Sequence, residues 1–225
     1  MSPQSPPATQ ADQYPAPTLI WGLPLVLVVL ALANVLPELI LQLSDQGLLP
    51  IAGLRAWAFA HGSFQPDLLT GPGPLFDLQP LTIFFTYGFL HTGLSHLLMN
   101  MAGLIWLGRL ILSYRTSEAF VLFYLMSMIG AAELFSLIGT GTTVGASGAL
   151  FGLLGVYAID AGYLASAKPA QEEASIQFFR LSLATVALAL SDLASQSLLG
   201  SLAAWQAHAG GFLTGAVMAL SLIHI

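Results

Sequence analysis

The chain has 225 residues, of which 56% are hydrophobic and only 7% are charged. An ordinary soluble domain carries roughly 25% charged residues, so this composition excludes a protein whose main solvent is water. The absence of cysteine excludes disulfides and a thiol nucleophile, and the scattered Lys and Arg residues, within a net charge of -6, exclude a nucleic-acid-binding patch.

Residues 1–17 are rich in Pro, Ser, Gln and Ala and contain no basic residue, so we expect a disordered N-terminal tail. The remainder, 18–225, is predicted to form one membrane domain. A hydrocarbon layer about 30 Å thick requires about 20 apolar residues per helix. Runs of roughly that length predict an all-α membrane protein with six transmembrane helices, at about 18–43, 94–112, 119–138, 147–165, 179–199 and 206–223.

The first span carries Pro24 and Pro37, and we expect either of them to kink it. The connection that follows, residues 44–80, is too apolar for a simple tether. It contains Arg55 and Trp57 and is broken by Gly-Pro-Gly-Pro. This composition predicts a short amphipathic helix in the membrane interface, and therefore a first loop that is partly embedded in the membrane.

Basic residues predict the orientation. Arg109 and Arg115 follow the second span, and Lys168 and Arg180 follow the fourth. Because cytoplasmic loops carry the excess of basic residues, we expect these connections and both termini in the cytoplasm, with the first loop facing outward.

The stretch VGASGALFGLLG places Ser147 between small residues where a loop enters an apolar helix. Its small neighbours allow another chain to approach the hydroxyl, and free N–H groups at a helix N-terminus favour negative charge. Alone, this pattern is as typical of loops and close helix contacts as of a nucleophile. If the helix ended near Asp160, it would cover only about 20 Å. Ser147 would then lie below the outer surface, at the floor of a water-filled pocket.

Two polar side chains of the second span, His96 and Asn100, lie one helical turn apart and could address the same oxygen. The alternative is that they tie helices together, at about 0.6 kcal/mol each.

His208 in the last span could serve Ser147 as a base. It shares a helix face with two glycines, and the fourth span offers a matching small surface, so the two helices should pack closely enough to bring His208 to Ser147. The glycines concerned are Gly211 and Gly215 in the last span and Gly148, Gly152 and Gly155 in the fourth.

With HTGLSHLLMN, GASGALFG and AHAGGFLTG in the second, fourth and sixth spans, the chain resembles the rhomboid intramembrane serine proteases of the bacterial six-span type. The resemblance implies Ser147 as nucleophile and His208 as general base. It implies an oxyanion hole formed by His96, Asn100 and the Ser147 N–H. Residues expected to support this site are His91, which would hydrogen-bond in the adjacent loop, Phe151, which would pack on the His208 ring, and Gly145, Gly148, Gly211 and Gly215.

The implied activity is cleavage of transmembrane segments of single-span membrane proteins within the lipid bilayer, in the inner (plasma) membrane, by a Ser-His dyad without an acidic third member. No cofactor and no metal are expected. The resemblance further suggests the fifth span, with Ser191, Asp192 and Ser195, as a lateral gate and residues 200–206 as a lid.

The chain departs from the family pattern in its scaffold. The Trp-Arg pair that many rhomboids carry before the FLH segment is replaced by Thr82 and Ile83, and Arg55 with Trp57 lies too far upstream to be the same pair. The anchoring of the first loop is thus left open. A glutamate that many carry soon after the glycine ending the second span is also missing after Gly108.

Two other functions compete with proteolysis. A catalytically silent rhomboid-like protein would bind or escort membrane segments, but such proteins usually lack the serine or the histidine. A small transporter would show a hydropathy repeat between halves, and none is evident. The remaining ionisable residues are expected to be solvated or paired between helices: His61, Glu133, Asp160, Asp192 and His224.

Overall fold

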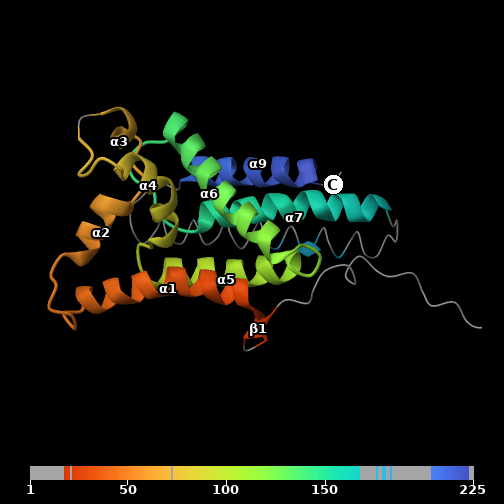
Figure 1. The fold of residues 1–225 in the computed structure, drawn as a ribbon, viewed down its shortest axis with the longest axis horizontal. Helices are drawn as coiled ribbons and strands as arrows, with labels where there is room; N and C mark the ends of the chain where they lie inside the picture. The colour runs from red at the N-terminus through yellow and green to blue at the C-terminus, as the bar shows by residue number, and fades with distance from the viewer. Residues whose placement is uncertain are drawn as a thin grey trace, which may run out of the picture.

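The computed structural model describes residues 18–20, 22–71, 73–167 and 204–222, together with 176, 179, 180 and 183. Long helices dominate this part of the chain (Figure 1). In chain order the elements are β1 (Leu19–Ile20), β2 (Leu23–Pro24), α1 (Leu25–Asp45), α2 (Leu54–Gly62), α3 (Asp67–Thr70), α4 (Gln79–Thr86), the 3-10 helix η2 (Tyr87–Phe89), α5 (Leu94–Ile111), α6 (Ser117–Ile138), α7 (Ser147–Ala167) and α9 (Trp205–Leu222).

The predicted spans agree with α5, α6, α7 and α9 to within two residues at each end. Within the described ranges, α1, α5 and α6 are long and apolar enough to cross a membrane. The fifth predicted span, 179–199, lies outside the described residues apart from three single positions.

The predicted start of the first span at residue 18 is wrong, because α1 begins only at Leu25. The preceding residues form a small antiparallel hairpin that turns at Gly22, whose φ of 76° suits a glycine. Pro24 is the residue before the helix and so does not kink it, whereas Pro37 lies inside α1.

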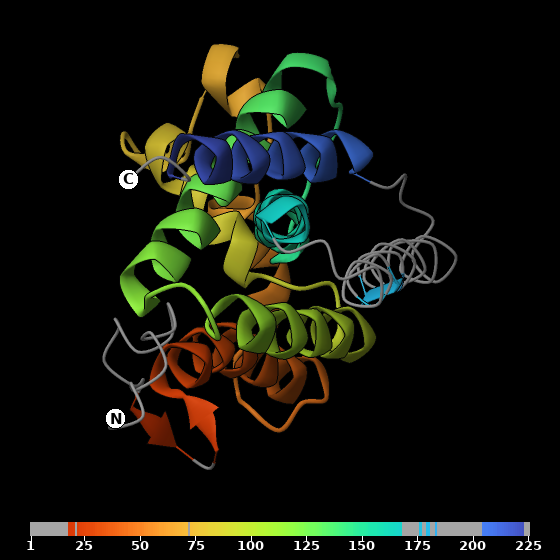
Figure 2. The same cartoon turned by 90° about the vertical axis from the view of Figure 1, so that its right-hand side faces the viewer.

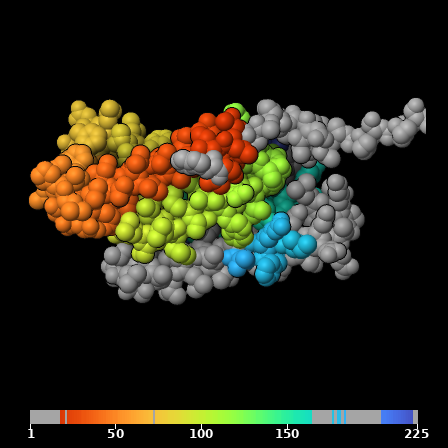
Figure 3. Space-filling model, turned by 90° about the horizontal axis from the view of Figure 1, so that it is seen from below, coloured from red at the N-terminus to blue at the C-terminus, as the bar shows by residue number. Residues whose placement is uncertain are grey.

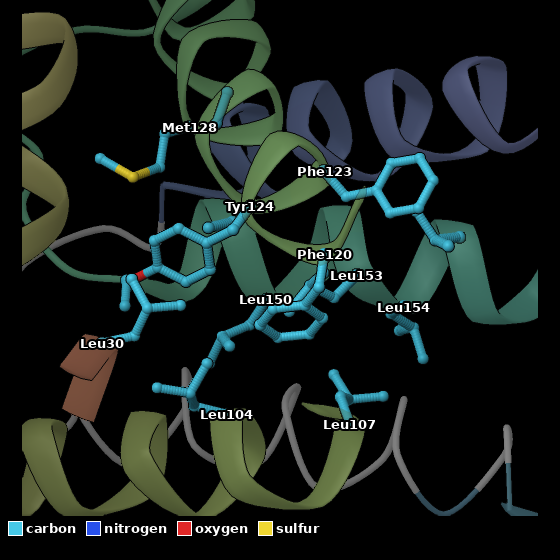
Figure 4. Close-up of a cluster of buried hydrophobic side chains, with 14 of the residues drawn as sticks. Leu30, Leu104, Leu107, Phe120, Phe123, Tyr124, Met128, Leu150, Leu153 and Leu154 are labelled. Carbon is cyan, nitrogen blue, oxygen red and sulfur yellow. The ribbon is translucent and has the colours of Figure 1, made fainter. Parts of the chain in front are cut away.

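Helix α7 lies at the centre of the bundle. It contacts α5, α6 and α9, and Figure 2 shows it nearly along its axis with these helices around it. Its apolar side chains meet those of the other helices in one core (Figure 4). Its members include Leu104 and Leu107 of α5, Phe120, Phe123 and Tyr124 of α6, and Leu150, Leu153 and Leu154 of α7.

The outward faces of the long helices are also apolar. Helices α1 and α5 lie side by side on one such face (Figure 3). Large exposed apolar side chains include Val29 and Leu36 of α1, Leu98 of α5, Leu122 and Leu137 of α6, and Leu213 and Val217 of α9. So many exposed apolar residues on long helices suit a hydrocarbon solvent and not water.

The connection between α1 and α5 is more structured than predicted. The expected short helix is present as α2, whereas α3 and α4 were not predicted. Two side chains bind this connection together: Tyr87 donates from its hydroxyl to the Met128 carbonyl (2.7 Å), and Thr86 donates to the Gly62 carbonyl (2.7 Å). The connection is therefore fixed to α6 at the end of the bundle where α7 begins.

Candidate active site

The loop before Ser147 is held by the connection between α1 and α5. Phe64 and Thr143 exchange two backbone hydrogen bonds, of 3.0 and 2.9 Å, and the Gly145 N–H donates to the Tyr87 carbonyl (2.9 Å). The first residue of α7 is Ser147. The serine hydroxyl therefore stands at a helix N-terminus, where backbone N–H groups have no partner within the helix.

Helices α7 and α9 pack through their glycines, as the sequence predicted. A methyl group added at Gly211 would collide with the Gly148 carbonyl oxygen, and one added at Gly215 with the Gly152 carbonyl oxygen. A methyl group at Gly155 would likewise collide with the Phe212 carbonyl oxygen. The order of these contacts shows that the two helices run in the same direction with their backbones nearly touching (Figure 1).

This packing brings His208 to Ser147. The His208 Nε2 atom lies 2.9 Å from the Ser147 Oγ atom, and the His208 side chain comes from the first turn of α9. The Phe151 ring stacks on the imidazole, with centroids 4.3 Å apart and planes 10° apart. Because His208 is only 7% exposed, the ring is held in one orientation by packing on one side and by the hydroxyl on the other.

His96 and Asn100 face the loop immediately before Ser147. A Cβ atom at Gly145 would lie 2.8 Å from His96 Nε2 and 3.8 Å from Asn100 Nδ2. Gly145 also has a φ of 120°, which side-chain-bearing residues rarely adopt. The glycine at this position thus leaves a small space that both polar side chains border, next to the nucleophile candidate.

His91 was expected to hydrogen-bond in the loop, and the group that does so is its main-chain carbonyl. Its main-chain carbonyl accepts from Arg55 Nη1 (2.8 Å), while both ring nitrogens are buried without a hydrogen-bond partner. The ring packs edge-on against the His96 ring, with centroids 5.0 Å apart and planes 67° apart. Burial, and then the nearby His96, lowers the pKa of His91 to about 3. The His91 ring is therefore neutral at physiological pH.

Other predicted residues fall outside this cluster. Asp160 of α7, expected to be either solvated or paired between helices, accepts two hydrogen bonds, of 2.5 and 3.1 Å, from Arg115 in the connection between α5 and α6. The His61 ring stacks on Trp57 in the first loop, and Glu133 is exposed. Ser191, Asp192, Ser195, His224 and residues 200–203 of the suggested lid lie outside the described residues.

The glycine contacts allow a direct stability test. We expect Gly211→Ala to lower the free energy of unfolding by about 1–3 kcal/mol relative to a matched glycine-to-alanine change, because the added methyl group overlaps a backbone oxygen that cannot move aside. Gly162→Ala on α7 is the control, since a Cβ there meets no atom within 4 Å. Both changes gain the same helix propensity. Equal unfolding midpoints for the two variants in detergent would contradict the packing described above.

The fold and the site together define a class of protein. It is a helical integral membrane protein that presents a serine and a histidine on two helices packed through glycines. A family model, described as the Rhomboid domain, matches residues 79–225. The chain belongs to the rhomboid family. It is also 45% identical over 75 residues to RHOMBOID-like protein 1 of Arabidopsis thaliana, a match that covers 32% of this chain and 18% of that protein.

Proposed function

We propose that this protein is an intramembrane serine endopeptidase in which Ser147 is the nucleophile and His208 the general base. The observation that carries the proposal is the 2.9 Å separation of Ser147 Oγ and His208 Nε2 at the start of two parallel, closely packed helices. A base within hydrogen-bonding reach of a hydroxyl, itself oriented by a packed ring, is the arrangement that nucleophilic catalysis requires.

The reaction is acyl transfer. The Ser147 Oγ atom forms a bond with the carbon of a peptide carbonyl while the His208 Nε2 atom accepts the hydroxyl proton. The C–N bond then breaks, and the protonated imidazole returns that proton to the leaving amine. A water molecule then attacks the ester carbon while His208 accepts its proton. The C–O bond to Ser147 breaks, and His208 returns the proton to the Ser147 Oγ atom, which restores the free hydroxyl.

Three N–H groups are assigned to the oxyanion: the Ser147 backbone N–H, His96 and Asn100. The Thr92 hydroxyl lies 3.1 Å from His96 Nδ1. If this hydroxyl donates, Nε2 carries the ring proton and can donate to an oxyanion. Asn100 uses one amide hydrogen for the His96 carbonyl (3.0 Å) and has a second to offer. The glycines and Phe151 support the site through the packing described above.

Helix α7 has 21 residues and so spans about 32 Å. It continues past Asp160, so its length alone does not place Ser147 below the outer surface. Its Asp160 pairs with Arg115 just beyond α5, where basic residues mark the cytoplasmic side. Ser147 lies 13 residues before Asp160, or about 20 Å along the axis, and therefore about 10 Å below the outer surface of a 30 Å layer.

In this proposal residues 18–225 form a six-span bundle in the inner (plasma) membrane. The tail expected at 1–17 lies outside the described residues. Both termini are cytoplasmic, and the site opens outward through a water-filled pocket. Substrates are single-span membrane proteins whose transmembrane segment enters sideways. Since an intact helix hides its carbonyls in hydrogen bonds, segments containing Gly, Pro or other helix-weakening residues should be preferred.

A fluorophosphonate probe tests the proposal. The purified wild type should become covalently labelled, and Ser147→Ala should reduce labelling to background because the reactive oxygen is gone. Ser136→Ala is the matched control, since its hydroxyl donates to the Glu133 carbonyl on α6 and takes no part in the site. No labelling of folded wild-type protein would reject the protease and favour the rhomboid-like protein that binds membrane segments without cutting them.

A further inference from the structure

The guanidinium of Arg55 joins three separate segments of the chain. From α2 it donates to both carboxylate oxygens of Glu38 on α1, through Nη1 (3.0 Å) and Nη2 (2.9 Å). Its Nε donates to Asp45 at the end of α1 (2.6 Å). Nη1 also donates to the His91 carbonyl (2.8 Å), just before α5. A planar fork of five N–H groups can satisfy such a set of acceptors, and a lysine cannot.

The Glu38 carboxylate is buried and paired with Arg55. Its side chain is 0% exposed, against 19% for Arg55 and 40% for Asp45. A buried carboxylate is tolerated only when it is paired and its lone pairs are used, and here the Gln42 amide supplies a further hydrogen bond (2.8 Å). Burial lowers the pKa of Arg55, but hydrogen bonds and charges of Glu38 and Asp45 raise it above its ordinary value. Arg55 thus stays charged, and its hydrogen bonds to Glu38 fix the two side chains against each other.

From Arg55 the contacts lead to His96. The carbonyl that Arg55 holds belongs to His91, whose ring packs edge-on against the His96 ring. The next residue, Thr92, places its hydroxyl 3.1 Å from His96 Nδ1. His91 and Thr92 contact the His96 ring on two sides. The Arg55 guanidinium holds this segment through the His91 carbonyl.

We propose that Arg55, fixed by Glu38, is a positioning residue for the oxyanion side of the site and acts through the segment from His91 to Thr92 on His96. The inference rests on the proposed function. It also gives the first loop its anchor: in a chain without the Trp-Arg pair before the FLH segment, an arginine far upstream holds the loop to α1 and to the start of α5.

The test is the double variant Arg55→Met with Glu38→Gln, assayed as full-length protein in proteoliposomes with a single-span reporter substrate. The double change removes both charges, so that no unpaired ion is left buried. We expect an unfolding temperature near that of wild type, an unchanged KM and a kcat lowered about tenfold or more, because small displacements of a group that stabilises the transition state act on kcat. Asp45→Asn is the control, since it keeps Glu38 and His91 in contact with Arg55, and its kcat should equal that of wild type.

A double variant with the stability and the kcat of wild type would overturn the inference, because Arg55 would then serve only to neutralise Glu38. If the double variant does not fold, the kcat of Arg55→Lys tests the inference instead. This variant retains the charge opposite Glu38 but cannot serve all the acceptors, so a lowered kcat at wild-type stability supports positioning and an unchanged kcat overturns it. Absence of Ser147-dependent cleavage by the wild type would overturn the proposed function and this inference together.

Discussion

Replacing His208 with alanine should lower kcat for cleavage of a transmembrane reporter by about 10⁴-fold or more, which corresponds to about 5.5 kcal/mol of barrier. The imidazole nitrogen lies 2.9 Å from the Ser147 hydroxyl, and the Phe151 ring holds it in that position. Without the base, the hydroxyl proton has no acceptor at this position as the C–O bond forms. KM should change little, because the base contributes to the transition state and not to ground-state binding.

The matched control is His61→Ala, which removes a histidine whose ring stacks on Trp57 in the first loop, away from Ser147. Its kcat should remain close to that of wild type. Both variants should unfold at similar temperatures in detergent, so that lost activity is not confused with lost fold. Cleavage by His208→Ala at the rate of the control variant would reject the base assignment and leave the 2.9 Å contact as helix packing alone.

The pairing of Ser147 with His208, 61 residues apart in the chain, could be predicted because each residue lies beside glycines at helical spacing. Such spacing specifies which helix faces can approach closely, and the collisions at Gly211 and Gly215 show the same faces in contact. The starts of α5, α7 and α9 were predictable to within one residue for a related reason, because small or polar residues precede an apolar run there.

The anchor at Arg55 could not be predicted in this way. Its partners Glu38 and His91 lie 17 and 36 residues away, and a single arginine in a loop has no periodic signal that selects one carboxylate over another. The one available clue was Glu38 itself, a carboxylate in the middle of an apolar run, which must face a partner or a cavity. The start of α1 was mispredicted because hydropathy does not register the turn at Gly22 or the helix-limiting Pro24.

The oxyanion assignment gives the second large effect: Asn100→Ala should lower kcat about 10²- to 10³-fold, equivalent to about 2.7–4 kcal/mol. Asn100 is 2% exposed, and its amide nitrogen faces the small space at Gly145. Only one of its two amide hydrogens is needed for the His96 carbonyl. The other can meet the charge that develops on the substrate oxygen, an interaction absent from the ground state, so KM should change little.

Asn34→Ala is a closely matched control for this prediction. Asn34 is also buried and makes the same hydrogen bond to the carbonyl four residues earlier, from its amide to Leu30 (2.7 Å), but it does so on α1. Any loss that comes merely from removing a buried amide and its helical hydrogen bond should therefore appear in both variants. The rate at which a fluorophosphonate phosphonylates Ser147, through a charged transition state that the same donors would stabilise, should fall in Asn100→Ala and stay near wild type in Asn34→Ala. Equal rates in the two variants would mean that Asn100 only ties helices together, and the oxyanion would then be left to His96 and the Ser147 N–H.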